Sequence, residues 1–242
     1  MFVGATAPIA AIGGLSALDL AALAWLGAAY WLIGWLVTHH PRGWLSAGEM
    51  ATAYRGLWMK RAARRNPRVT DITLLATLRN GTSFLASMTM FAIGGAVALL
   101  GQIDLLESLA QDIAGGFDAP RSAQQAKLLV LIALLIFAFM KFIWSIRVFG
   151  YCGVVMGAMP GDQEGDEEPE IEREAARAAE LNRIAARNFN EGLRAIYFSL
   201  ALLSWFLGPI ALMIATTLVT GMLIRREFAS ETRKALRFGN FR

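Results

Sequence analysis

Basic and amide side chains near the ends of apolar segments have the most scope for chemistry in this sequence. They come from separate parts of the chain, and each lies near the level where a long apolar stretch meets a basic connection: Arg79, Asn80, Lys141, Arg147, Asn188, Asn190 and Arg194. An arginine guanidinium donates forked hydrogen bonds that match a phosphate group, and basic pockets between membrane helices bind lipid headgroups. The pattern therefore predicts a pocket for a phospholipid headgroup or another anion.

Lys141 leaves the most alternatives open. It precedes Arg147 by six residues, which places it about 9 Å deeper along a helix. A lysine at this depth can extend its ammonium group to the lipid headgroups, or it can pair within the bundle, for example with Asp71 or with a partner's carboxylate. The third possibility is the anion pocket itself.

Groups for catalysis or metal binding are scarce. Cys152 is the only cysteine, and His39 and His40 are adjacent, so their side chains diverge. No carboxylate lies near the middle of an apolar stretch, whereas proton-coupled transporters commonly use one. The acidic run 162–174 lacks the ligand spacing of a calcium loop and indicates a solvated linker. We expect no catalytic residue, metal, cofactor or nucleic-acid partner, and we favour a non-catalytic protein over an enzyme.

Long apolar stretches must position these side chains. With 56% hydrophobic and 17% charged residues, the chain has such stretches at about 17–37, 82–103, 128–146 and 196–224. Each is about as long as the ~20 residues that a helix needs to cross a bilayer. The sequence therefore predicts an all-α, polytopic transmembrane helical bundle of about four spans. We expect a single membrane domain over residues 1–242, with connecting segments at 38–81 and 147–195.

The distribution of Lys and Arg predicts the orientation. Segments 38–81 and 147–195 are rich in basic residues, and no Lys or Arg precedes Arg42. Basic residues near span ends are held on the cytoplasmic side. We therefore expect both segments in the cytoplasm, the N-terminus in the periplasm, and a multi-pass protein of the bacterial inner membrane. The first apolar stretch lacks a basic n-region and is read as a retained helix.

The end of the chain conflicts with this count. Four crossings would put the C-terminus outside, yet the tail is basic, with Arg225, Arg226, Arg233, Lys234, Arg237 and Arg242. The last stretch is also unusually long and contains Gly208 and Pro209, which interrupt a helix. Two interpretations stay open. The stretch is either one kinked span or a re-entrant hairpin whose arms have only about 11–15 residues.

The connecting segments should be helical. Ser46 and Glu49 have capping-box spacing, which predicts a helix to about Arg65. Its apolar positions would share one face, so the helix can lie in the membrane interface or pack against the protein's own helices. The candidate interfacial residues are Trp58, Lys60, Arg61, Arg64 and Arg65. Two long helices should extend from the cytoplasm into the membrane, from Thr70 or Asp71 to about Gly101 and from Pro169 to about Leu207.

Several short blocks, in order along the chain, resemble a known family. They are Asn66–Asp71, Ser83–Ser87, Lys141-Phe142 with Trp144-Ser145 and Arg147, Tyr151-Cys152, Asn188-Phe189-Asn190 with Gly192 and Arg194, and Arg225–Phe228. Together they resemble a bacterial family catalogued as a domain of unknown function, which is also found in plants. The resemblance extends from about Leu18 to Phe228. It implies an inner-membrane protein of roughly four spans, and it supplies no activity, cofactor or catalytic residue.

These observations leave two classes of function. The first is a non-catalytic integral membrane protein that binds a protein partner, anionic lipid or both through a basic cytoplasmic face, as an accessory subunit or a homo-oligomer does. The alternative is a small oligomeric channel or conduit for an ion or small solute, which needs no buried carboxylate.

Overall fold

The structure, a computed structural model, describes residues 14–39, 45–103, 120–159 and 168–237. All elements with bounds in these ranges are helices, which confirms the predicted all-α class. They are α1 (Ala17–Thr38), α2 (Ala47–Ala63), α3 (Val69–Leu100), α5 (Arg121–Ala158), α6 (Glu168–Leu203), the short 3₁₀ helix η2 (Ser204–Leu207), α7 (Pro209–Phe228) and α8 (Glu231–Arg237).

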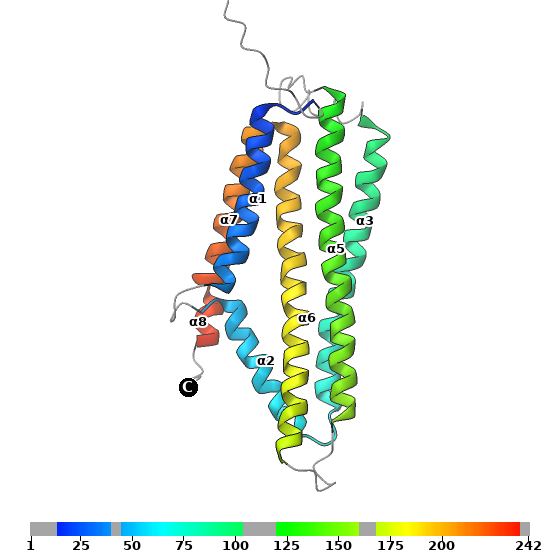
Figure 1. Ribbon diagram of the computed structural model, residues 1–242, viewed down its shortest axis with the longest axis vertical. Coiled ribbons are helices and arrows are strands. Elements are labelled where there is room, and N and C mark those ends of the chain that lie inside the picture. The colour runs from blue at the N-terminus through cyan, green and yellow to red at the C-terminus, as the bar shows by residue number, and fades with distance from the viewer. Residues whose placement is uncertain (1–13, 40–44, 104–119, 160–167, 238–242) are drawn as a thin grey trace, which may run out of the picture.

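The helices form an elongated bundle in which α3, α5 and α6 run along most of its length (Figure 1). α5 packs against both α3 and α6. It lies between them in the upper half of Figure 1, whereas lower down α3 passes behind α5. In the upper half, as oriented in Figure 1, α1 and α7 lie side by side next to α6. In the lower half, α2 runs from the end of α1 towards the foot of α6, and α8 contacts α2.

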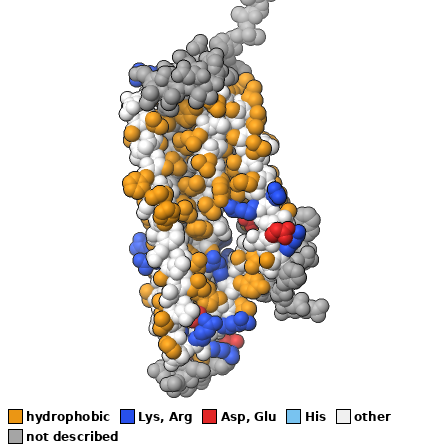
Figure 2. Space-filling view, turned by 180° about the vertical axis from the view of Figure 1, so that it is seen from behind, with side chains coloured by type: hydrophobic (Ala, Val, Ile, Leu, Met, Phe, Trp, Pro, Cys, Tyr) orange, Lys and Arg blue, Asp and Glu red, His pale blue; other side chains and the backbone are white. Residues whose placement is uncertain are grey.

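The upper half has the properties of a membrane domain. α1, α3, α5 and the segment that begins at Pro209 are each long and apolar enough to cross a membrane. Figure 2 shows hydrophobic side chains over most of this half, with Lys and Arg gathered mainly from mid-height downward. Large apolar side chains such as Trp31, Phe91 and Leu218 are exposed here, as expected of a surface that lipid covers. The chain is a multi-pass membrane protein.

The last apolar stretch, predicted as one span over residues 196–224, is divided by a reversal of the chain. α6 continues through η2, and after Gly208 the chain turns so that α7 descends beside α1 (Figure 1). Gly208 has φ 125° and ψ 164°, a conformation that favours glycine, and Pro209 suits the first position of α7. The kinked span is therefore wrong. A hairpin replaces it, and with 20 residues α7 is longer than the expected re-entrant arm.

This reversal resolves the conflict over the basic tail. The upper part of α6 and α7 each pass through the upper half, whereas the prediction counted residues 196–224 as a single crossing. α1 and α7 run in the same direction, with Trp25 Nε1 donating a hydrogen bond to the Thr217 hydroxyl at 3.2 Å. α7 therefore ends near the level where α1 ends, with Arg225 and Arg226 in its last turn. The tail lies on the same side of the upper half as the other basic connections.

α2 packs against the protein's own helices. It begins with the predicted capping box between Ser46 and Glu49 and ends at Ala63. Its buried side chains include Met59 and Ala62, which pack into a core shared with α5 and α6. Tyr54 of the same helix is exposed. α2 descends away from the upper half, an arrangement that favours packing on α6 over lying in the membrane interface (Figure 1).

α5 and α6 approach each other closely because small residues line their contact. A Cβ atom added to Gly192 would lie 2.8 Å from the buried Phe142 ring. The Ser145 hydroxyl donates to the Ala185 carbonyl at 2.8 Å, and buried Cys152 donates weakly to a carbonyl of α6. This close packing sets the distance over which side chains of the two helices can pair.

The corner between α2 and α3 is held by polar contacts. Neither Thr70 nor Asp71 caps α3; Arg68 is the residue before its first turn. Asp71 is buried instead and accepts hydrogen bonds from Trp58 Nε1 at 2.7 Å and Arg65 Nη1 at 2.5 Å. The Arg68 guanidinium donates to carbonyls at the end of α2 and of α5. Asp71 thus ties α2 to α3 and is not the partner of Lys141.

Candidate anion-binding site

A cluster of polar and aromatic side chains lies where the upper half of the bundle meets the lower half. Three helices contribute to it. We call it the mid-height cluster, and it consists of Tyr30 from α1, Phe137 and Lys141 from α5, and Asn188, Glu191 and Arg194 from α6.

Lys141 is paired across the contact between α5 and α6. Its ammonium nitrogen lies 2.5 Å from Oε2 of Glu191 and 3.5 Å from Oδ1 of Asn188. The same nitrogen lies 5.4 Å from the centre of the Phe137 ring, which adds a cation–π contact. The side chains of Lys141 and Glu191 keep 29% and 27% of their surface exposed. Lys141 thus pairs within the bundle, and its partner is Glu191, not Asp71.

Arg194 has no such partner. Its guanidinium lies over the Tyr30 ring, 5.0 Å from the ring centre, and close to Gly34 of α1. Nε of Arg194 is buried and makes no hydrogen bond. Among the described residues, no carboxylate lies within ion-pair distance of this guanidinium. Arg194 is therefore a cation held on an aromatic face without a counter-charge.

The depth of Arg194 makes its lack of a counter-charge unusual. Gly34 precedes Thr38, the last residue of α1, by four positions, or about 6 Å along the helix. The guanidinium therefore lies within the length of an apolar helix that can cross a membrane. Two cations, Lys141 and Arg194, and one carboxylate, Glu191, leave the cluster with one excess positive charge. Ionisable groups at membrane depth are costly and commonly mark functional sites.

A second arginine, on α7, also lies on an aromatic ring. Arg226 lies over the ring of Tyr197, 5.1 Å from its centre, and donates to the tyrosine hydroxyl at 2.9 Å. Tyr197 follows Arg194 by about one turn of α6. The nearest carboxylate to Arg226 is that of Glu227, at 3.7 Å. α6 thus takes part in two contacts between a guanidinium group and an aromatic ring, with Arg194 as the cation in one and Tyr197 as the ring in the other. Guanidinium groups held in this way suit an anionic group with several oxygen atoms.

The remaining predicted pocket residues lie elsewhere. Arg79 and Asn80 are exposed on α3, a helix that packs against α5. Arg147 donates from Nε to the Tyr151 hydroxyl at 2.8 Å on the exposed side of α5. Asn190 is exposed on α6. The structure therefore brings together Lys141, Asn188 and Arg194 of the predicted set, whereas the other four residues are distributed over several faces.

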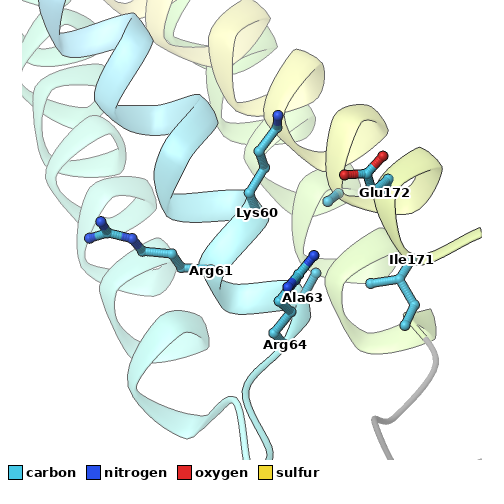
Figure 3. Close-up of a pocket in the computed structure, with 7 residues that line it drawn as sticks. Lys60, Arg61, Ala63, Arg64, Ile171 and Glu172 are labelled. Atoms are coloured by element: carbon cyan, nitrogen blue, oxygen red, sulfur yellow. The ribbon is translucent and has the colours of Figure 1, made fainter. Parts of the chain in front are cut away.

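The predicted interfacial residues lie at the far end of the lower half. A pocket of about 270 Å³ is lined there by Lys60, Arg61, Ala63, Arg64, Ile171, Glu172 and Ala175. Figure 3 shows Lys60 and Arg64 directed towards the first turns of α6 and Arg61 directed away from them. α2 has 17 residues, so this end lies roughly 25 Å along the helix from its start near α1. The basic end of α2 is thus far from the surface of the upper half. Trp58 and Arg65, at this end of α2, hold Asp71 at the corner between α2 and α3.

Arg55 on the same helix contributes to the core of the lower half. Its Nη1 donates to Oδ1 of buried Asn182 at 2.5 Å. Burial lowers the pKa of the Arg55 guanidinium from its ordinary value. This arginine therefore fixes α2 on α6 and is not directed towards a ligand.

A second polar cluster, at the upper end of the bundle, was not predicted. We call it the upper cluster, and it consists of Asp19, Lys127 and Trp205. Trp205 Nε1 donates to Oδ1 of Asp19 at 2.7 Å, and Lys127 donates to the Trp205 carbonyl at 3.1 Å. Lys127 Nζ lies 3.9 Å from Oδ1 of Asp19, and Ser16 donates to the other carboxylate oxygen. The capping-box spacing of Ser16 and Asp19 could have revealed the first part of this cluster.

Over residues 17–232 the chain matches the family described as "Protein of unknown function, DUF599". The chain belongs to the DUF599 family. No curated protein and no solved structure matches it. Every residue of the mid-height cluster and of the upper cluster lies within the DUF599 region. Among the described residues of this DUF599 chain, no group of histidine, cysteine and carboxylate side chains could hold a metal ion.

Proposed function

We propose that this protein is a non-catalytic integral membrane protein that binds the phosphate of an anionic phospholipid at the mid-height cluster. The observation that carries the proposal is the guanidinium of Arg194, which lies on the Tyr30 ring beside the last turns of the apolar helix α1, without a counter-charge among the described residues. A charge in this position is costly unless an anion compensates it. The anion most abundant at this depth is a lipid phosphate.

The geometry supports phosphate as the bound group. Tyr30 holds one face of the Arg194 guanidinium, so the edges of the planar group are left to donate hydrogen bonds. Arg226 is held in the same manner on Tyr197 and can contribute a second set of donors. Aromatic contacts reduce the side-chain freedom that would otherwise be lost on binding, which favours a specific site over a diffuse basic surface.

Charge distribution supports placing the lower half in the cytoplasm of a bacterial cell. The basic connections and the basic tail lie at mid-height or below, on one side of the apolar half, and Lys and Arg near span ends favour the cytoplasmic side. The cytoplasmic leaflet is also the one in which anionic lipids attract basic segments. In this orientation the mid-height cluster faces the inner leaflet of the inner membrane, and the N-terminus is periplasmic.

Binding is tested by native mass spectrometry of the purified full-length chain with added phosphatidylglycerol, phosphatidylcholine or inorganic phosphate. We expect Arg194→Gln to reduce phosphatidylglycerol binding about tenfold or more, since a hydrogen bond to a charged group contributes about 1.5–3 kcal/mol. Arg79→Gln is the matched control, because it removes the same charge from an exposed position on α3 and should leave binding within about twofold.

Three other outcomes would contradict the proposal. Equal losses in Arg194→Gln and Arg79→Gln would mean that only the total positive charge matters. Tighter binding of inorganic phosphate than of phosphatidylglycerol would indicate a site for a soluble anion. If the chain purifies with a stoichiometric acidic protein partner and no lipid, the group that binds Arg194 is a protein carboxylate and not a lipid phosphate.

A further inference from the structure

Glu191 is the acidic side chain best placed to neutralise Arg194, yet it does not do so. The two residues are separated by three positions on α6, a spacing at which side chains of a helix are neighbours and opposite charges attract. The Glu191 carboxylate is instead 2.5 Å from the ammonium nitrogen of Lys141 on α5. The unpaired state of Arg194 therefore depends on where Glu191 is held.

Several contacts hold the Lys141 ammonium on the α5 side of Glu191. Asn188 presents Oδ1 to Lys141, and its own Nδ2 donates to the Ile184 carbonyl at 2.9 Å, which fixes the orientation of the amide. Phe137 supplies the cation–π contact. Gly192 allows α6 to pack closely on Phe142, so the two helices are near enough for Lys141 to reach the carboxylate.

The aromatic rings connect this pair to the Arg194 position. Phe137 contacts Lys141 on one side and makes an edge-to-face contact with Tyr30 on the other, with ring centres 6.3 Å apart. Tyr30 in turn holds the Arg194 guanidinium. The cluster thus separates its charges, with the carboxylate beside α5 and the unpaired cation beside α1.

We propose that Lys141 is a positioning residue that keeps the anion site open by holding Glu191 away from Arg194. This inference rests on the proposed function, because it concerns the same site. Without Lys141, Glu191 would turn to Arg194 and form an ion pair, which would neutralise the guanidinium and repel a phosphate group. Lys141 therefore supports anion binding without contacting the anion.

The test is the phosphatidylglycerol titration with Lys141→Gln, Glu191→Gln and the double variant of both. We expect Lys141→Gln to weaken binding about tenfold, which corresponds to about 1.4 kcal/mol. Glu191→Gln should bind at least as tightly as the parent. The double variant should recover to within about threefold of the parent, because no carboxylate is left to occupy Arg194. Lys141→Arg, which preserves the charge, is the conservative control and should bind like the parent.

Two results would overturn the inference. If the double variant binds as weakly as Lys141→Gln, Lys141 contacts the phosphate itself. If Lys141→Gln binds like the parent, Glu191 does not reach Arg194. The thermal midpoint of each variant without lipid shows whether that variant is folded. If Lys141→Gln does not fold, Glu191→Gln still tests the inference. Weaker lipid binding by Glu191→Gln than by the parent would contradict it. A failure of the proposed function is distinguishable, because Arg194→Gln would then also bind like the parent.

Discussion

The upper cluster and the mid-height cluster are built from the same part of the fold at two heights, with α1, α5 and the chain of α6 and η2 contributing to both. In the upper cluster, Lys127 and Asp19 are only 4% and 8% exposed, and their charges balance. Both oxygens of Asp19 accept hydrogen bonds. In the mid-height cluster, Lys141 and Glu191 remain partly exposed, and Arg194 has no counter-charge among the described residues.

This difference separates a structural role from a binding role. A buried pair whose hydrogen bonds are satisfied fixes the helices that it joins, here the turn between α6 and α7 against α1 and α5. A cluster with an excess charge and open donors stabilises the fold little and is complete only when an anion binds. The two clusters should therefore respond in opposite ways to the loss of a cation.

The largest effect is expected for Lys127→Met in the upper cluster. The substitution leaves the Asp19 charge buried beside Trp205 without its cation, and breaking such a pair costs about 3–5 kcal/mol. The measurement is the free energy of unfolding in detergent. Asp19→Asn combined with Lys127→Met should recover much of the loss, because no buried charge is then unpaired. If Lys127→Met changes the free energy of unfolding by less than about 0.5 kcal/mol, the upper cluster does not have a structural role.

The next effect concerns the helix contact that supports the mid-height cluster. In Gly192→Ala the new methyl group would lie 2.8 Å from the Phe142 ring, and such overpacking costs about 1–3 kcal/mol of unfolding free energy. Gly150→Ala is the control on α5, because nothing lies within 4 Å of its added Cβ, and it should be neutral or stabilising. Equal melting temperatures of the two variants would contradict close packing at Gly192.

A smaller effect is expected where Asp71 ties α2 to α3. Trp58→Phe removes the indole donor to buried Asp71 but leaves the Arg65 contact, so about 1–2 kcal/mol should be lost. The exposed Trp144 makes no hydrogen bond among the described residues, and Trp144→Phe is the matched control. If both variants melt at the same temperature, the Trp58 contact contributes nothing to the corner.

The smallest effect, and the sharpest contrast with Lys127, is expected for Arg194→Gln in the absence of lipid. The substitution removes a cation that has no counter-charge in the part of the chain that the structure describes. The unfolding free energy should therefore change by no more than about 0.5 kcal/mol or rise slightly. Thermal unfolding in neutral detergent provides the comparison. A loss as large as that of Lys127→Met would mean that Arg194 is a structural residue.

Much of the fold follows from local features of the sequence. The lengths of the apolar stretches gave the bundle, and the capping box at Ser46 located the start of α2. The reversal at Gly208 was left open because hydropathy reports how apolar a segment is and does not report its direction. The sequence also did not identify the upper part of α6 as a separate passage through the upper half. The polar residues near Arg194 leave this part of α6 with a shorter apolar stretch than a membrane-spanning helix needs.

The candidate site was harder to predict than the fold. Lys141 and Arg194 could be predicted, because a basic residue near the end of an apolar stretch can be recognised from that segment of the sequence alone. The partners of these residues were missed. Glu191 and Tyr30 acquire their roles only when the rotation of α1, α5 and α6 about their axes is fixed, which depends on packing contacts such as Gly192 against Phe142. The sequence likewise could not show that Arg79 is exposed on α3 and lies outside the cluster.

The most direct test of the central claim is an experimental structure of the full-length chain in nanodiscs that contain phosphatidylglycerol. We predict a lipid phosphate within hydrogen-bond distance of the Arg194 guanidinium, with Glu191 still paired to Lys141. A structure in which Arg194 pairs with a carboxylate, from Glu191 or from a second copy of the chain, and in which no phosphate lies at the mid-height cluster, would contradict it.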